Sequence, residues 1–250
     1  MASPAVAVIP ARYDSTRFPG KPLADVLGVP MIVRVARQAA SAARVDRVIV
    51  ATDDARIAEV VEAHGFSVAM TPADCPSGSD RVAHAIRGLG GAPGLVVNVQ
   101  GDEPLVDPRD IDRLVAAGLA HPEAICTLGR PADPAEVASP HVVKAVVAPG
   151  GRALYFSRAP IPHGEGPHVQ HVGLYAYAPD VLARFTALTP TPLERRERLE
   201  QLRALENGIP IHLEMCVSDR PSVGVDVPAD LDRVRAILTR QGTGKQEHGS

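Results

Sequence analysis

Three basic side chains stand close together in a polar turn near the start of the chain. Arg12, Arg17 and Lys21 fall within ten residues and directly follow the apolar run Ala5–Ile9. Guanidinium groups fork onto phosphate oxygens and a lysine adds a point charge, so the turn suits a polyphosphate. The alternative is a solvated basic turn, because these residues form neither a Walker loop nor a dinucleotide-binding motif.

Carboxylates appear at two places where an apolar run gives way to a turn. Asp102 and Glu103 follow the run Val96–Val99, and Asp226 stands just before Pro228. Mg2+ prefers carboxylate oxygens, phosphate oxygens and water as ligands. The two aspartates therefore predict a metal site beside the basic turn. The alternatives are a surface turn for Asp102 and a helix N-cap for Asp226.

Further polar candidates lie in two later stretches. Ser77 and Gly78 belong to a turn that leads into a predicted helix, where exposed backbone groups could read a base or simply cap the helix. In the second half, Arg158 could hold a carboxylate, and His171 and Tyr175 share one face of a predicted strand. From spacing alone, each second-half residue fits a structural role better than a ligand role; the full group is Lys144, Ser157, Arg158, His171, Tyr175, Glu200 and Gln201.

Apolar runs alternate with amphipathic stretches through the first half of the chain. Strands are expected at Ala5–Ile9, Arg47–Ala51, Ser67–Met70, Leu95–Gln100 and Ala124–Leu128, and helices at Met31–Ala43, Asp54–His64, Ser79–Leu89 and Asp107–Ala117. Ser79 is the expected N-cap of its helix. This strand–helix alternation predicts an α/β fold with a mostly parallel sheet and helices on both faces.

The pattern changes after about residue 140. Strands at Val142–Val147, Ala153–Ser157 and Gln170–Tyr177 predict a small antiparallel extension, and Pro192–Glu206, Ile209–Val217 and Pro228–Leu238 predict a helix, a strand and a last helix. One domain is expected over residues 1–238, with a dimerisation and acceptor extension at about 140–208. The polar residues 239–250 are expected to be disordered.

Composition restricts the class of protein. A length of 250 residues suits one α/β domain, and a net charge of −3 gives no support to nucleic-acid binding. The apolar runs are too short for a membrane span or a signal peptide. Cys75, Cys126 and Cys216 are widely spaced and odd in number, which fits free thiols in the cytoplasm.

Taken together, the motifs resemble those of the 3-deoxy-manno-octulosonate (Kdo) cytidylyltransferases, also called CMP-Kdo synthetases. The resemblance covers residues 5–238, nearly the whole chain. In chain order the motifs are IPARYDSTRFPGKPL at 9–23, VIVATDD at 48–54, SGSDR at 77–81, VNVQGDEP at 97–104, ALYFSRAPIP at 153–162, HVGLYAY at 171–177, PLERRERLEQLRALENG at 192–208 and GVDVPADL at 224–231.

The resemblance implies a Rossmann-like homodimer that uses Mg2+ to transfer CMP from CTP to an acidic sugar, releasing pyrophosphate. It implies catalytic roles for Arg12, Lys21 and Asp102, and Mg2+ ligands in Asp102 and Asp226. The residues implied for the nucleotide are Ala11, Arg12, Ser15, Lys21, Ser77, Gly78, Arg81 and Gln100, and those for the acceptor are Gln100, Arg158, His171, Tyr175, Glu200 and Gln201.

Two features depart from the family pattern. The segment between Pro162 and Gln170 is shorter than the charged excursion that family members carry, and Val227 replaces an expected threonine. Kdo is the expected acceptor, while a small phosphonate such as phosphonoformate, or another sugar acid, is the alternative. A non-catalytic nucleotide-binding module is a more distant alternative, since such a module predicts loss of Lys21 or of the metal carboxylates.

Overall fold

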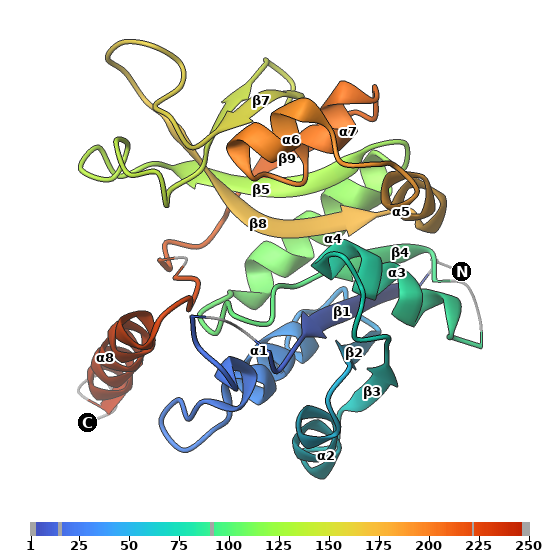
Figure 1. Ribbon diagram of the computed structural model, residues 1–250. Helices are drawn as coiled ribbons and strands as arrows, with labels where there is room; N and C mark the ends of the chain where they lie inside the picture. The colour runs from blue at the N-terminus through green and yellow to red at the C-terminus, as the bar shows by residue number, and fades with distance from the viewer. Residues whose placement is uncertain (1–3, 15–16, 91–92, 222, 247–250) are drawn as a thin grey trace.

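The computed structural model describes residues 4–14, 17–90, 93–221 and 223–246, which form helices on both faces of one sheet (Figure 1). The strands are β1 (Ala5–Ala11), β2 (Arg47–Thr52), β3 (Ser67–Met70), β4 (Leu95–Asn98), β5 (Ile125–Pro131), β6 (Lys144–Val147), β7 (Ala153–Ser157), β8 (Val169–Tyr177) and β9 (Ile211–Met215). The helices are the 3-10 turn η1 (Lys21–Leu23), α1 (Met31–Ala40), α2 (Ala55–Ala63), α3 (Gly78–Arg87), α4 (Pro108–Ala120), α5 (Pro179–Thr186), α6 (Pro192–Glu197), α7 (Leu202–Glu206) and α8 (Pro228–Gln246).

The main sheet has the strand order β3-β2-β1-β4-β8-β5-β9. Strands β1 to β4 pair in parallel, β5 pairs in parallel with β9, and β8 runs antiparallel between β4 and β5. The predicted mostly parallel α/β fold is confirmed. The predicted antiparallel extension is only partly correct. Strand β8 lies within the main sheet, and the hairpin β6–β7 branches from β8.

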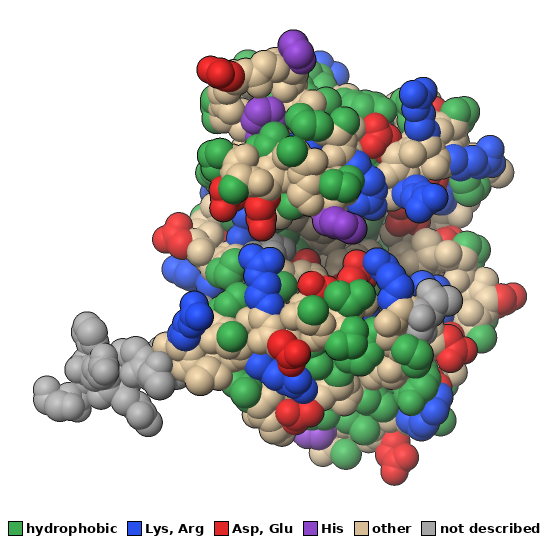
Figure 2. Space-filling model, turned by 60° about the vertical axis from the view of Figure 1, so that its left-hand side comes forward, with side chains coloured by type: hydrophobic (Ala, Val, Ile, Leu, Met, Phe, Trp, Pro, Cys, Tyr) green, Lys and Arg blue, Asp and Glu red, His purple; other side chains and the backbone are tan. Residues whose placement is uncertain are grey.

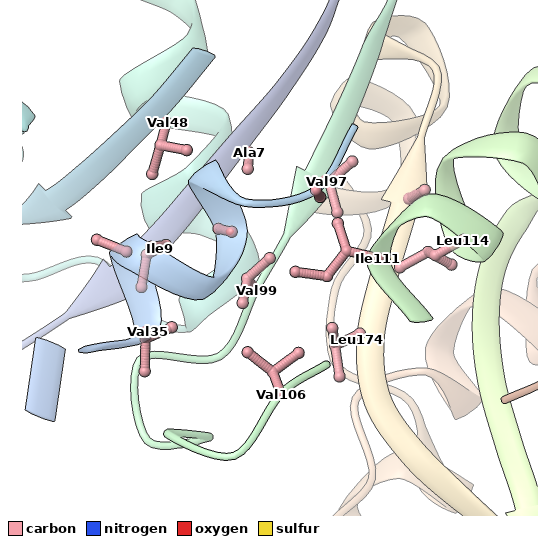
Figure 3. Packing of buried hydrophobic residues seen from close by; sticks show 14 of the residues in the cluster. Ala7, Ile9, Val35, Val48, Val97, Val99, Val106, Ile111, Leu114 and Leu174 are labelled. Atoms are coloured by element: carbon pink, nitrogen blue, oxygen red, sulfur yellow. The ribbon is translucent and has the colours of Figure 1, made fainter. Parts of the chain in front are cut away.

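Alternation along β1 divides the core between the two faces of the sheet. Ala7 and Ile9 belong to the cluster formed with α1, α2 and α4, whereas Val6 and Val8 belong to the cluster formed with α3, α5 and α7. Figure 3 shows the first cluster, with Ile111 of α4 close to strand β4. Successive strand residues point to opposite faces, so one buried strand supports both layers.

The start of α3 differs from the prediction by two residues. Ser77, not Ser79, is the N-cap: its backbone is extended and its hydroxyl accepts a hydrogen bond from Asp80 N at 3.2 Å. Ser79 lies inside the first turn, where its hydroxyl donates to Glu200 at 2.8 Å. Both serines suit an N-cap locally, and the contact with Glu200, far away in the sequence, separates their roles.

The prediction of a single helix over Pro192–Glu206 is wrong. Arg198 adopts a left-handed backbone with φ of 54°, which ends α6 and separates it from α7. The break lets Leu199 enter the core and brings Glu200 to α3. Helix α5, which begins with Pro179 at its first turn, was not predicted.

Helix α8 lies apart from the sheet, beside the loops that lead into α1 (Figure 1). Leu231 and Val234 of α8 pack with Val26, Met31 and Val225 in a third apolar cluster. The helix continues past Leu238 to Gln246, through part of the segment expected to be disordered. Among the described residues, no helix combines the length and apolar character that a membrane span requires.

Core packing predicts that two leucines of α4 contribute very differently to the free energy of unfolding. Leu114 is fully buried in the first cluster, whereas Leu119 is 46% exposed. Replacing Leu114 by alanine leaves a cavity and should lower the free energy of unfolding by about 2–5 kcal/mol. Leu119→Ala, the matched control on the same helix, should change it by less than about 0.5 kcal/mol. Denaturant unfolding measures both values, and equal losses would contradict this packing.

Candidate active site

A pocket of about 330 Å³ opens at the carboxyl ends of β1 and β4 and at the N-terminus of α3. Ligands of open parallel sheets bind at this edge. Figure 2 shows a groove across this face of the molecule, with basic and acidic side chains along it. The pocket is lined by Pro10, Ala11, Arg12, Arg17, Lys21, Pro22, Cys75, Pro76, Ser77, Gly78, Arg81, Gln100, Gly101, Asp102 and Asp226.

The basic turn after β1 forms one wall of this pocket. Gly20 takes a left-handed backbone with φ of 69°, and its N–H donates to Tyr13 O at 3.0 Å, which closes the turn. The Tyr13 ring packs beside Gly20 on one side and under the guanidinium of Arg56. Arg12, Arg17 and Lys21 are thereby brought to the pocket. Ser15, expected to bind nucleotide, lies outside the described residues.

Asp102 reaches the pocket because the turn after β4 passes very close to β1. A Cβ atom added at Gly101 would lie 2.8 Å from Pro10 O, so only glycine allows this approach. The Asp102 carboxylate accepts a hydrogen bond from Lys21 Nζ at 2.7 Å. Its backbone carbonyl accepts one from Val225 N at 2.9 Å, which places Asp226 beside it. The carboxylate of Asp102 therefore belongs to the pocket and not to an isolated surface turn.

Asp226 is not the cap of α8. The carboxylate of Asp230 accepts hydrogen bonds from the backbone N–H groups of Asp226 and Val227, at 2.9 and 3.0 Å. The Asp226 carboxylate instead pairs with Arg17 at 3.1 Å and approaches Lys21 Nζ at 3.7 Å. Of the two interpretations available from the sequence, the structure favours a role in the site.

The N-terminus of α3 forms the opposite wall. Ser77 and Gly78 line the pocket, where the first N–H groups of a helix provide a partial positive charge. Arg81 is buried and donates to Asp53 at 3.0 Å and also to Thr71. Asp53 and Thr71 hold this guanidinium in place, and sequence reasoning missed them both. Asp53 is the first of the two aspartates that end the motif VIVATDD, directly after β2, and this position is the signal that could have indicated it.

The expected acceptor residues of the second half do not line this pocket; Gln100 alone does. Glu200 accepts a hydrogen bond from Ser79 of α3, and the rings of His171 and Tyr175 lie 5.6 Å apart. Burial raises the pKa of Glu200. Removal from water lowers the pKa of His171 to about 3, so its imidazole is neutral, and its Nε2 lies 2.9 Å from Thr127 Oγ1.

Arg158 and Gln201 differ in the hydrogen bonds that their side chains make to the rest of the protein. The Arg158 guanidinium donates to backbone carbonyls of Pro140, Glu197 and Arg198, at 2.9, 2.9 and 3.3 Å. Gln201 is buried, and its Nε2 has no hydrogen-bond partner among the described residues. Residues 162–167, the shortened segment, are all exposed and stand outside the pocket lining.

Sequence reasoning also passed over several residues that the fold brings to the pocket. Cys75 and Pro76 line it from the turn before α3, and Pro10 lines it beside Gly78, where an added Cβ atom would lie 3.5 Å from the Pro10 ring. Arg17 was assigned to the basic turn but not to the site. An apolar or small residue carries no chemical signal in the sequence, so only the fold identifies such positions.

Known proteins match the chain over nearly its full length. The family model described as Cytidylyltransferase matches residues 6–213. A 3-deoxy-manno-octulosonate cytidylyltransferase of Mesorhizobium japonicum is 53% identical, over 93% of this chain and 98% of its own. The enzyme of that name from Myxococcus xanthus is 50% identical, over 95% of this chain and 97% of its own.

Solved structures agree with the sequence relatives. A CMP:2-keto-3-deoxy-manno-octonic acid synthetase solved with CTP superposes with a TM-score of 0.90 at 42% identity, over 96% of this chain and 100% of that one. A nucleotidyl transferase from Methanothermobacter thermautotroptrophicus, at 18% identity and a TM-score of 0.64, shares the fold. With a family model that spans most of its length and relatives at half identity, the chain belongs to the cytidylyltransferase family.

Proposed function

We propose that this protein transfers CMP from CTP to 3-deoxy-manno-octulosonate and releases pyrophosphate. The observation that carries the proposal is the convergence in one pocket of the basic turn, two carboxylates and the N-terminus of α3. The names of the relatives at 53% and 50% identity support the choice of acceptor. The protein then works as a CTP-dependent nucleotidyltransferase.

The nucleotide is assigned to the two walls of the pocket. Arg12 and Lys21 bind the triphosphate from the basic turn, and Ala11 and Ser15 are assigned to the same ligand. The backbone of Ser77 and Gly78 contacts the cytosine, and Arg81 contributes a fixed positive charge. Because Asp53 holds the Arg81 side chain at 3.0 Å, that charge is oriented before the nucleotide arrives.

Asp102 and Asp226 are assigned to Mg2+. Their fit is tested by the cation already between them: Lys21 Nζ lies 2.7 Å from one carboxylate and 3.7 Å from the other. Within the described residues no group of three or more acidic, histidine or cysteine side chains is placed to hold a metal. Two carboxylates leave room for phosphate oxygens and water, which Mg2+ prefers to an all-protein cage. Bound Mg2+ supplies charge neutralisation at the phosphates.

The proposed reaction requires no covalent intermediate between the protein and a substrate. An acceptor oxygen attacks the α-phosphorus of CTP in line with the departing pyrophosphate, so positioning and charge stabilisation supply most of the catalysis. Arg12 and Lys21 stabilise negative charge on the phosphate oxygens. Gln100 lines the pocket and is assigned to both substrates.

The sugar acid is assigned to residues of the second half, Arg158, His171, Tyr175, Glu200 and Gln201. The hydrogen bond from Ser79 to Glu200 joins one of them to the helix that forms a wall of the nucleotide pocket. The Nε2 of Gln201 is buried and has no hydrogen-bond partner among the described residues, so it is assigned as a donor to a hydroxyl or carboxylate of the acceptor. Association of two chains as a homodimer and a cytoplasmic location complete the proposal.

A second acceptor class is a small phosphonate such as phosphonoformate, or another sugar acid. The shortened segment 162–170, of which residues 162–167 are exposed, favours a smaller acceptor, because a shorter segment leaves the acceptor side of the chain less covered. Val227 stands beside the metal aspartate without the hydroxyl that family members have. Relatives at half identity carry the Kdo name, so Kdo stays the first choice.

An acceptor assay tests the proposal. The protein is incubated with CTP, Mg2+ and one acceptor at a time: Kdo, phosphonoformate or a sialic acid. Pyrophosphate release should be observed with Kdo and should be at least about tenfold slower with the others, a difference of about 1.4 kcal/mol in transition-state binding. Release with phosphonoformate but none with Kdo would reverse the order of the two acceptors.

The metal assignment is tested by Asp102→Asn, which keeps the size of the side chain and removes its charge. Turnover should fall about 100-fold or more, because a preorganised charge at the reacting phosphate is lost. Circular dichroism should show an unchanged fold. Asp180→Asn, on the exposed start of α5, is the matched control and should keep wild-type turnover. Wild-type turnover in Asp102→Asn would remove this residue from the metal site.

A further inference from the structure

Lys21 occupies the place between the two carboxylates assigned to Mg2+. Its Nζ lies 2.7 Å from Asp102 Oδ2 and 3.7 Å from Asp226 Oδ1, and the lysine side chain is only 15% exposed. Arg17 shares the same oxygen of Asp226 at 3.1 Å from the solvent side. The negative charge of the two aspartates is thus compensated by two side chains of the basic turn.

We infer that Lys21 is an exchangeable counter-ion of the metal carboxylates. Its ammonium group holds Asp102 and Asp226 in the nucleotide-free protein and moves to the triphosphate when CTP binds, so the free protein takes up the metal only weakly. This inference rests on the proposed function, since it requires that the two aspartates be the metal ligands.

Competition between the ammonium group and the metal follows from their chemistry. A lysine ammonium group has three hydrogen-bond donors and no lone pair, so it cannot coordinate a metal ion together with the carboxylates. It can only occupy the place of the metal between them. A divalent ion that enters must either displace the ammonium or sit close to a like charge inside a pocket partly withdrawn from water. Each alternative weakens binding of the metal to the free protein.

The geometry of the turn allows the side chain alone to move. Lys21 N donates to Phe18 O at 3.2 Å, and Lys21 O accepts from Ala24 N at 3.0 Å, which fixes its backbone in η1. The four-carbon stem of a lysine is flexible and carries a compact charge. Lys21 lines the same pocket as Arg12 and the N-terminus of α3, so a triphosphate bound there lies within reach of its ammonium group.

The nucleotide therefore exchanges two cations in one step. Its phosphates attract Lys21 away from Asp102, and the Mg2+ that accompanies the nucleotide replaces the lysine charge at the carboxylates. Charge at the aspartates stays compensated before and after the exchange. The metal is then retained by the site chiefly in the presence of the nucleotide that it serves.

Mn2+ binding to the nucleotide-free protein tests the inference. Free Mn2+ is followed by electron paramagnetic resonance during titration of wild type and Lys21→Met. The variant should bind Mn2+ at least about tenfold more tightly. Arg12→Met is the matched control, because Arg12 lines the pocket but, within the described residues, makes no ion pair with either carboxylate. It should change the affinity less than about threefold, since solvent screens its charge.

The outcomes separate this inference from the proposed function. A folded Lys21→Met protein with wild-type Mn2+ affinity, together with loss of turnover in Asp102→Asn, would leave the metal site standing and overturn the role of Lys21. Wild-type turnover in Asp102→Asn would instead overturn the metal site itself. The gain in Mn2+ affinity caused by Lys21→Met should vanish in the double variant that also carries Asp102→Asn. Lys21→Gln gives the same test if circular dichroism shows that the methionine variant does not fold.

Discussion

Two carboxylates cannot stand side by side at the mouth of a pocket unless positive charge lies between them, because their Coulomb repulsion grows as water is excluded. Asp102 and Asp226 meet this constraint with the ammonium group of Lys21 and the guanidinium of Arg17. The basic turn and the acidic residues are therefore two halves of one charge-compensated unit. That unit is stable without a ligand and can exchange its inner cation.

The fold supplies this unit from three segments that are far apart in the sequence. Gly101 lets the turn after β4 pass against Pro10 of β1, and the hydrogen bond from Val225 N to Asp102 O fixes the third segment beside the second. Helix α8 and the start of α1 share an apolar cluster that holds Val225. Core packing at some distance from the charges thereby sets their positions.

Sequence patterns predicted those helices and strands that are determined by residues close together in the sequence. Strand β3 was placed at Ser67–Met70, as found, because it is a short, mainly apolar run between two amphipathic stretches. The cap of α3 and the break at Arg198 were missed, since both depend on Glu200 meeting Ser79 across the core. Likewise, Asp226 suited two roles until the structure placed its carboxylate with Arg17 and left the cap to Asp230.

The same contact links the two halves of the proposed site. Helix α3 presents Ser77 to the pocket and Ser79 to Glu200, so under the proposed function one rigid element would orient both substrates. If Arg158 binds the acceptor as proposed, it would add selectivity for acids, because its guanidinium already binds backbone carbonyls. A neutral acceptor group offers it no stronger bond than those carbonyls, whereas a carboxylate forms a charge-assisted pair. An acidic acceptor is thus the class of ligand that can draw Arg158 into the site.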